Sequence, residues 1–471
     1  MTHEADAPEL VADPASQFAM AQEARVLAAA RALFPGGVPI GLPHDGVPER
    51  LKATERALAR GDSAIFEATF SEDGVVVVVD ILAHEKGSNT LIEVSSSTSI
   101  QDHDLMDAAL KALVLRRVGV EVDAVEIMHL NDACRYPDLD DLFVREAVSG
   151  RVRALFPEIS ALISDQAKRL RAPLPEVQVG RHCDKPRPCP FRSRCWPVLP
   201  RHHVETFFGL RQEMSAQLEA QGLEAVEDVP GSFPLTLIQR RQQRSVTQGE
   251  LQVEGDLAGA LAPLKGRVAY LDFETLGLAI PVWEGLGPWH PHPVQFSCHI
   301  ASPDQDLEHV AWLGEGPGDS RSAMARALVD ALDGVETVVT YNLGSDRKCF
   351  ELIASGAPDQ ARALNAIKSK LRDLLPLVRN HVYHPDFLGS FDLDSVLPAL
   401  IPDLEDGSRG DSNGQTPAST LHRLLFLGYP KESAERDTLR QGLLDHCAMK
   451  TLALLRLKER LDGLAEGDVQ G

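Results

Sequence analysis

The chain has 471 residues, of which 44% are hydrophobic and 25% charged, a balance that excludes collagen-like, coiled-coil and disordered proteins. It carries 47 Lys and Arg against 69 Asp and Glu, and the net charge of −22 excludes a polycation that coats nucleic acid along its whole length. No apolar run reaches the roughly 18 residues of a membrane helix, and the N-terminus lacks the pattern of a signal peptide. We therefore expect a cytoplasmic protein of several domains, with no membrane partner.

The N-terminal region predicts an α/β domain. A helix is expected before Pro35, strands over 64–70 and 75–82 with a turn between them, and a third strand over 90–94. A helix over 104–118 and a strand over 122–130 follow. Strands that alternate with helices in this way are typical of an α/β fold.

Two acidic residues lie at the ends of neighbouring predicted strands. Asp80 ends a run of five valines, and Glu93 follows Leu91 and Ile92 on the next strand. Carboxylates placed this way can share a divalent cation, because hard cations prefer oxygen ligands. Glu67, on the preceding strand, is a third candidate. The alternative is that acids in a hairpin simply face water.

The middle of the chain changes character. Residues 181–201 are strongly basic and contain Cys183, Cys189 and Cys195, with five residues between one cysteine and the next. This spacing is not that of a zinc ribbon, and an odd total of 7 cysteines scattered over a long chain does not indicate disulfides. The basic residues are a candidate track for nucleic-acid phosphates, with a solvated loop as the alternative. We interpret residues 201–262 as a connector.

A second α/β domain is expected over residues 263–465. Strands are predicted over 268–273, 294–300 and 309–313, then a helix over 320–332, a buried strand over 335–341 and a mostly helical remainder. Asp272 and Glu274 are two residues apart in the first of these strands, so their side chains point to the same side of the sheet.

Three segments of the N-terminal region resemble the core of RecB-like nucleases of the PD-(D/E)XK class: Phe66–Phe70, Asp80–Leu82 and Glu93–Thr98. Nearly the whole chain is similar to a bacterial family that joins such a domain to a DEDD exonuclease-like domain. The resemblance implies a restriction-endonuclease fold over residues 1–200 and an RNase H-like fold over 263–465. It also implies phosphodiester hydrolysis with Mg²⁺ or Mn²⁺, on nucleic acid, with DNA favoured over RNA.

The N-terminal site departs from the family pattern at one position. The family carries a lysine two residues after the glutamate, where this chain has Ser95. On the following helix, Lys111 stands where the family usually presents a glutamine. An ammonium from that helix could replace the missing one, since lysine is a point charge on a long stem. The alternative is that Lys111 pairs with Asp107 one turn away on a solvated face.

The cysteine segment is similar to the cluster-binding end of iron–sulfur RecB-like nucleases. In those proteins a 4Fe–4S cluster joins the ends of the nuclease domain through four thiolates, and this sequence lacks the fourth cysteine near its N-terminus. Three outcomes stay open: a three-cysteine cluster, a Zn²⁺ site completed by His182, or a vacant remnant of such a site.

The C-terminal acids match the DEDD pattern in part. The resemblance assigns Asp272, Glu274 and Asp346 as metal ligands and His446 as a catalytic residue. The fourth acid of the family is replaced by Lys450. Asp394 lies where the family typically carries a lysine, so the two charges have exchanged places. We expect this site to bind at most one metal ion and to be slow or inert, unless the exchanged pair preserves it.

Two classes of function remain in competition. The retained carboxylates at Asp80, Glu93, Asp272, Glu274 and Asp346 favour a nuclease. The changes at Ser95 and Lys450 favour a nucleic-acid-binding or scaffold protein built from two inactive nuclease folds. A small-molecule enzyme is disfavoured, because the chain has no glycine-rich phosphate loop or nucleophile motif. The sequence does not indicate protein partners.

Overall fold

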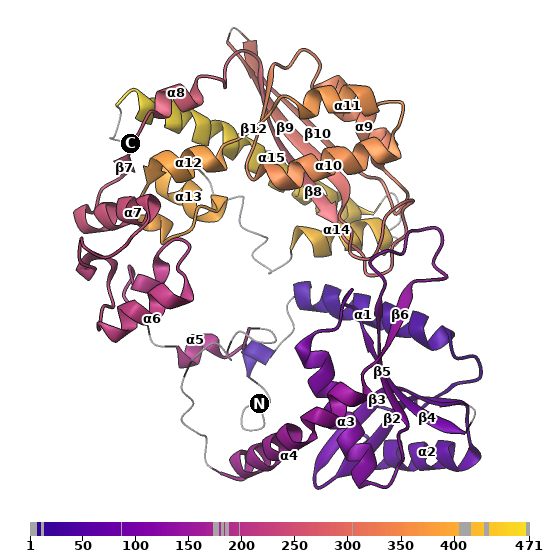
Figure 1. Ribbon diagram of the computed structural model, residues 1–471. Coiled ribbons are helices and arrows are strands. Elements are labelled where there is room, and N and C mark those ends of the chain that lie inside the picture. Colours follow the sequence, from indigo (N-terminus) through magenta and orange to yellow (C-terminus); the bar gives the residue numbers. More distant parts are fainter. Residues whose placement is uncertain are drawn as a thin grey trace. The chain divides into compact units, whose positions relative to one another are not determined.

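The computed structural model describes residues 7–10, 14–85, 87–172, 179, 183, 188–196, 198–303, 305–404, 416–427 and 433–467. They form a mixed α/β protein whose helices and strands are drawn in Figure 1. The chain divides into two compact units. Unit 1 contains Met1–Trp196 and Gly277–His290, and unit 2 contains Pro197–Leu276 and Pro291–Gly471.

Unit 1 is built on a six-stranded sheet whose strands follow chain order. β2 to β4 form an antiparallel meander, and β5 pairs parallel with β4. That parallel pair requires a crossover, which the helix α3 supplies. The strands are β1 (Val38–Pro39), β2 (Ala64–Glu72), β3 (Val75–Glu85), β4 (Ser88–Ser95), β5 (Ala124–Leu130) and β6 (Phe143–Ala147).

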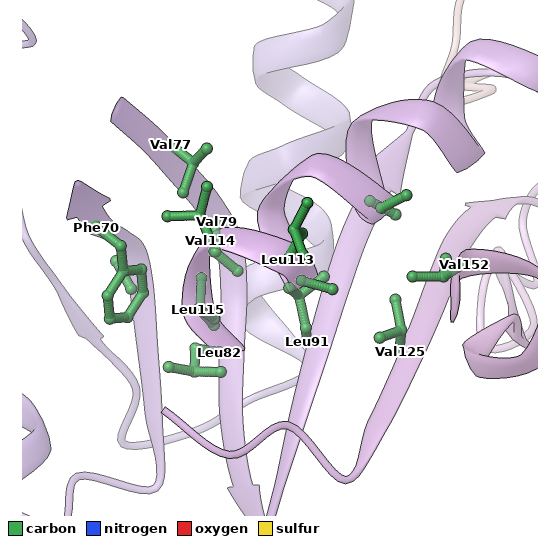
Figure 2. Packing of buried hydrophobic residues seen from close by; sticks show 14 of the residues in the cluster. Phe70, Val77, Val79, Leu82, Leu91, Leu113, Val114, Leu115, Val125 and Val152 are labelled. Carbon is green, nitrogen blue, oxygen red and sulfur yellow. The ribbon is translucent and has the colours of Figure 1, made fainter. Parts of the chain in front are cut away.

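Both faces of the unit 1 sheet are covered by apolar side chains. On one face, α3 (Asp102–Arg117) packs on β2 to β5 and on α4 (Ser149–Arg171). Figure 2 shows this core, with Val79, Leu91 and Val125 of the strands facing Leu113 of α3. On the other face, α1 (Pro14–Ala32) packs on β4. The helix α2 (Val47–Arg60) packs on β2 from the same side as α3, because its Ala57 belongs to the same core as the α3 side chains. The strands, the turn and the helix that the sequence predicted in this region are confirmed within a few residues.

Unit 2 contains a five-stranded sheet with the order β10-β9-β8-β11-β12. The pairs β8–β9 and β9–β10 are antiparallel, whereas β8–β11 and β11–β12 are parallel. The strands are β8 (Val268–Leu276), β9 (His292–Ser302), β10 (Gln305–Leu313), β11 (Thr337–Thr340) and β12 (Leu371–Asp373). A two-stranded sheet pairs β7 (Gln252–Val253) with β13 (Val382–Tyr383).

Helices cover both faces of this second sheet. Ala269, Leu271 and Phe273 of β8 pack with α9 (Arg321–Ala331) and α10 (Leu343–Gly356). Val268 and Tyr270, on the opposite face, pack with α15 (Ala434–Ala465). Because side chains alternate along a strand, Asp272 and Glu274 share the face of Tyr270 and point toward α15.

The remaining α-helices of unit 2 lie before β8, between β11 and β12, and after β12. They are α6 (Gln212–Ala220), α7 (Leu237–Gln248), α8 (Leu257–Leu261), α11 (Ala361–Lys368), α12 (Leu375–His381), α13 (Leu393–Leu400) and α14 (Pro417–Phe426). None of the helices in the described part of the chain has the length and apolarity needed to cross a membrane.

The division into units differs from the expected domain boundaries in two places. Residues 201–262, interpreted as a connector, belong to unit 2, where β7 pairs with β13. The segment Gly277–His290 lies between β8 and β9 of unit 2 but belongs to unit 1. Sequence periodicity does not reveal such an excursion, because it reports local structure and not which core a segment joins.

Candidate functional site

The acids of unit 1 lie where regular strand pairing stops. The ladder between β3 and β4 ends at the pair Ile81 and Ile92, and the next residues are Asp80 and Glu93. In place of a ladder hydrogen bond, the backbone N–H of Val94 donates to Asp80 Oδ2 at 2.9 Å. The strands therefore bring Asp80 and Glu93 together, as the sequence pattern predicted.

The strand beside Asp80 is irregular at Glu67. Pairing between β2 and β3 passes from Phe66 directly to Ala68, and Glu67 between them has a φ of 58°. A left-handed conformation costs a residue with a side chain about 1–2 kcal/mol. Two guanidinium groups compensate by binding the Glu67 carboxylate, that of Arg31 at 2.8 Å and that of Arg50 at 3.3 Å. Glu67 is thus engaged in ion pairs with these arginines.

Lys111 projects from α3 onto the carboxylate of Glu93. Its ammonium forms an ion pair with Glu93 Oε2 and a second one with Asp107 Oδ2 at 2.7 Å. The Lys111 side chain is only 12% exposed, so it does not lie on a solvated face. Burial alone would lower the pKa of Lys111, but the charges of Glu93, Asp80 and Asp107 raise it above its ordinary value. The lysine therefore stays protonated.

The surroundings of Glu93 fit a divalent cation. Burial and the nearby charge of Asp80 raise the pKa of Glu93 well above its usual value, against the effect of Lys111. Its second oxygen, Oε1, is buried and accepts no hydrogen bond from the described residues. A hard cation binds favourably beside two carboxylates when one buried oxygen has no hydrogen-bond partner, because the cation then supplies the missing interaction. Asp80 and Glu93 would be the residues that hold it.

A cavity of about 460 Å³ opens beside Asp80. One wall comes from α1 and the other from the end of β4 and the start of α3. The lining residues are Met20, Glu23, Ala24, Val26, Leu27, Asp80, Val94, Ser95, Ser96, Ser97, His103 and Asp104. Ser95, which replaces the lysine of the family pattern, is among them, so its small side chain leaves space open at this position.

In unit 2, β8 and α15 build a second cluster. β8 presents Asp272 and Glu274, and α15 presents His446, Cys447 and Lys450. His446 and Lys450 are four residues apart and lie on the same side of the helix. Within the described residues, one group of three potential ligand atoms lies within 4.8 Å of one another, and it consists of Asp272, Glu274 and Cys447.

The ammonium of Lys450 binds both carboxylates of β8. Its Nζ lies 3.1 Å from Asp272 Oδ2 and 2.8 Å from Glu274 Oε1, while His446 Nε2 is 3.9 Å from the same Glu274 oxygen. Burial would lower the pKa of Lys450, but the two carboxylates raise it above its usual value. Asp394 lies exposed on α13, and none of the described hydrogen bonds or ion pairs joins it to Lys450. The structure thus places a permanent cation between the first two acids.

Asp346 lies buried at the start of α10, with 5% of its surface exposed. Burial and the charge of Asp272 raise the pKa of Asp346 to about 7. Burial and the same charge raise the pKa of the Cys447 thiol well above its ordinary value. A protonated thiol is a poor ligand, because metals bind the thiolate. Together with the ammonium of Lys450, these groups fit a two-cation centre poorly.

Asp346 gives the unit 2 cluster a pH-dependent stability. The folded pKa of about 7 exceeds the reference value of 3.8, so between these values the folded state keeps a proton that the unfolded state has released. The stability that this bound proton contributes is fully present below pH 3.8 and is lost as the pH rises through 7.

Between pH 5 and 8, in the presence of a chelator, the free energy of unfolding of the parent should fall by about 2–3 kcal/mol more than that of Asp346→Asn. Urea denaturation measures this, and equal slopes for the two proteins would contradict it.

The three clustered cysteines are all free thiols. The N–H of Cys189 donates to the carbonyl of Cys183 at 2.6 Å, and Cys195 ends the short helix α5 (Arg192–Cys195). Within the described chain, their sulfur atoms do not form a group within 4.8 Å of one another. His182 and the basic residues Arg181, Lys185 and Arg187 lie outside the described residues. Arg194 is bound to Glu9 by two hydrogen bonds of 2.6 Å.

A metal at these cysteines stays a prediction with three distinguishable results. Protein purified without oxygen should carry iron and sulfide, with the broad visible absorption of such clusters. Zinc at about one ion per chain would instead indicate a site completed by His182. If a folded, reduced sample holds neither metal, the motif is a remnant, and Cys183→Ser should leave the thermal midpoint unchanged.

Two residues of these clusters were not singled out from the sequence. Arg50, which holds Glu67, is fully buried on α2, and a buried arginine leaves no periodic signal in a polar helix. Cys447 lies three residues before Lys450 on α15, on the same face of the helix. That spacing could have revealed it, because side chains three and four residues apart are neighbours on a helix.

Residues 269–392 match a family model described as a domain of unknown function, DUF2779. Comparisons with curated proteins and with solved structures gave no significant match. The matched residues include Asp272, Glu274 and Asp346, together with the segment 277–290, and they end before α13 and α15.

Proposed function

We propose that unit 1 is a metal-dependent nuclease that hydrolyses phosphodiester bonds, with DNA as the favoured substrate. One observation carries this proposal. Lys111 of α3 pairs with Glu93 beside Asp80, so a lysine and two acids meet although position 95 is a serine. Three charged groups that converge from a helix and two strands are hard to explain by folding alone, because burying them costs free energy.

The chain's own groups have separate roles in this proposal. Asp80 and Glu93 hold Mg²⁺ or Mn²⁺, and Asp80 is oriented by the N–H of Val94. A bound cation of this kind polarises the phosphodiester and lowers the pKa of water. Lys111 opposes burial and the charge of Asp80, which raise the pKa of Glu93, and it offers its remaining N–H groups to the phosphate or the attacking water. The cavity beside Asp80 gives the substrate access.

The sheet topologies support the two nuclease folds that the sequence resembles. In unit 1, an antiparallel meander is followed by a helix and a parallel strand, the order expected of a RecB-like PD-(D/E)XK core. In unit 2, the strand order is β10-β9-β8-β11-β12, and β8, β11 and β12 are parallel to one another. This is the arrangement expected of an RNase H-like core. Fold alone does not determine activity, so the assignment depends on the site residues.

For unit 2 we propose a nucleic-acid-binding or scaffolding role in place of hydrolysis. The observation that favours it is the ammonium of Lys450, at 3.1 and 2.8 Å from the two carboxylates that would otherwise hold metal. No catalytic step is assigned to this cluster, since the groups present do not fit the two cations of a DEDD centre.

The test is degradation of labelled single- and double-stranded DNA and RNA in Mg²⁺ or Mn²⁺. We expect cleavage by the parent chain and by Asp272→Ala, and none by Asp80→Ala. Glu55→Ala is a matched control, because Glu55 is an exposed acid on α2 of the same unit. Cleavage that survives Asp80→Ala but disappears in Asp272→Ala would reverse the assignment. A parent chain that binds nucleic acid without cleaving it would favour the binding role for both units.

A further inference from the structure

The segment 277–290 is an irregular stretch that joins the core of unit 1. Four of its apolar residues are almost fully buried: Leu278, Ala279, Trp283 and Leu286, with exposed fractions of 1%, 0%, 3% and 2%. Ala279 and Trp289 pack in one cluster with Val26 of α1 and Val94 of β4. Both of these partners line the cavity beside Asp80.

Polar contacts fix the segment to unit 1 at three places. The N–H of Ala279 donates to Gln22 Oε1 at 3.2 Å, and Gln22 is a fully buried residue of α1. Two backbone hydrogen bonds join the segment to Tyr136, at 2.8 and 3.0 Å. The backbone of the segment at Gly287 lies close to Cys134, since a Cβ added at Gly287 would be 2.9 Å from the carbonyl oxygen of Cys134. The segment therefore packs tightly against unit 1.

The third place is the cavity itself. The indole Nε1 of Trp289 donates to the backbone carbonyl of Ser96 at 2.6 Å. Ser96 belongs to the turn of Ser95, Ser96 and Ser97 that lines the cavity directly after Glu93 and Val94. Through Gln22 and Ser96, the segment thus holds both walls of the cavity, the helix on one side and the serine turn on the other.

The backbone of Trp289 is strained. Its φ is 59°, a left-handed conformation for a residue with a bulky side chain. Such a conformation persists where the surroundings fix it, here through the Trp289 N–H donated to Leu278 O at 2.8 Å and the indole bond to Ser96. Strain of this kind concentrates at functional sites.

We propose that Trp289 is a positioning residue for the Asp80–Glu93 site, supplied by a segment that lies outside the N-terminal 196 residues. The indole of Trp289 binds the carbonyl of Ser96 and thereby fixes the turn that follows Val94. The backbone N–H of Val94 in turn orients the carboxylate of Asp80. The nuclease role of this site rests on the proposed function, whereas the anchoring of the cavity walls does not.

Trp289→Phe in the full chain tests the inference, because phenylalanine keeps an aromatic ring and loses the N–H. The hydrogen–deuterium exchange rate in residues 92–100 should rise about fivefold or more, because one hydrogen bond that opposes local opening is lost. The exchange rate in residues 268–273 of unit 2 should not change. Gln22→Met should raise exchange in residues 18–30 in the same way. Trp312→Phe, the same change on β10 of unit 2, is the matched control and should alter neither region.

A catalytic readout separates positioning from stability. Trp289→Phe should lower kcat about tenfold or more and raise the Mn²⁺ concentration for half-maximal rate, with KM for nucleic acid changed less. Unchanged exchange in residues 92–100, or a kcat equal to that of the parent, would overturn the proposal. If the parent chain cleaves nothing, the proposed function fails, and the exchange experiment alone decides whether Trp289 anchors the turn.

Discussion

Lys111→Met should reduce metal-dependent cleavage by about 100-fold or more, to the level of Glu93→Gln. The substitution keeps the length of the side chain and removes the ammonium that pairs with Glu93 and Asp107. Without that charge, nothing opposes burial and Asp80, which already raise the pKa of Glu93, so the carboxyl holds its proton more tightly and a metal ion displaces that proton less readily. Rates at saturating Mn²⁺ measure the effect.

The fold must survive for this result to be interpreted. Breaking a buried ion pair costs about 3–5 kcal/mol, less where the remaining acid takes up a proton, as Glu93 can. Circular dichroism and the thermal midpoint should therefore show a folded but less stable chain. Lys52→Met, at an exposed lysine of α2, is the matched control and should leave both rate and stability unchanged. Full cleavage by Lys111→Met would refute the role given to this lysine.

Lys450→Asp should convert the unit 2 cluster from a closed ion pair into a metal site. The change alters the local charge by two units and removes an ammonium that competes with cations for Asp272 and Glu274. At about 4 Å and an effective dielectric constant near 20, one such contact is worth about 4 kcal/mol before desolvation. We expect Mn²⁺ affinity to rise by about 100-fold or more.

Calorimetry in an Asp80→Ala background isolates this cluster from the unit 1 site. Lys458→Asp is the control, because Lys458 lies on the same helix and pairs with Asp462 instead of the β8 acids. If Asp394 and Lys450 form a compensating pair, Lys450→Asp should weaken binding and Asp394→Lys with Lys450→Asp should restore it. The exposed position of Asp394 leads us to expect no rescue.

Local patterns in the sequence predicted the elements that carry both clusters. The valine run before Asp80, the turn at Asp73 and Gly74, and the alternation around Asp272 each involve residues close in the chain, so spacing alone defines them. The helix α3 was predicted within two residues at its start. Which acids share a strand end, and on which face, follows from such patterns.

Contacts between distant residues were not accessible in this way. The sequence left two alternatives for Lys111, a role at the site in place of the missing lysine or a pairing with Asp107. The structure shows ion pairs of Lys111 with both Glu93 and Asp107. The left-handed conformation of Glu67 is stabilised by Arg31 and Arg50 from two different helices. The place of residues 277–290 depends on a core whose other members lie between residues 26 and 143. Such features depend on tertiary packing, and the local patterns of a single sequence do not reveal which distant residues come into contact.

The excursion of residues 277–290 limits how the gene can be divided or recombined. A chain that stops near residue 200 would expose Val26, Leu130 and Leu142, which the intact protein covers with Ala279. Exchanging the C-terminal half for that of a relative would also replace residues 277–290, which pack in the core of unit 1. The two halves must therefore vary together during evolution. Recombinant expression of the first half alone should yield aggregated protein, and adding residues 277–290 through a linker should restore its solubility.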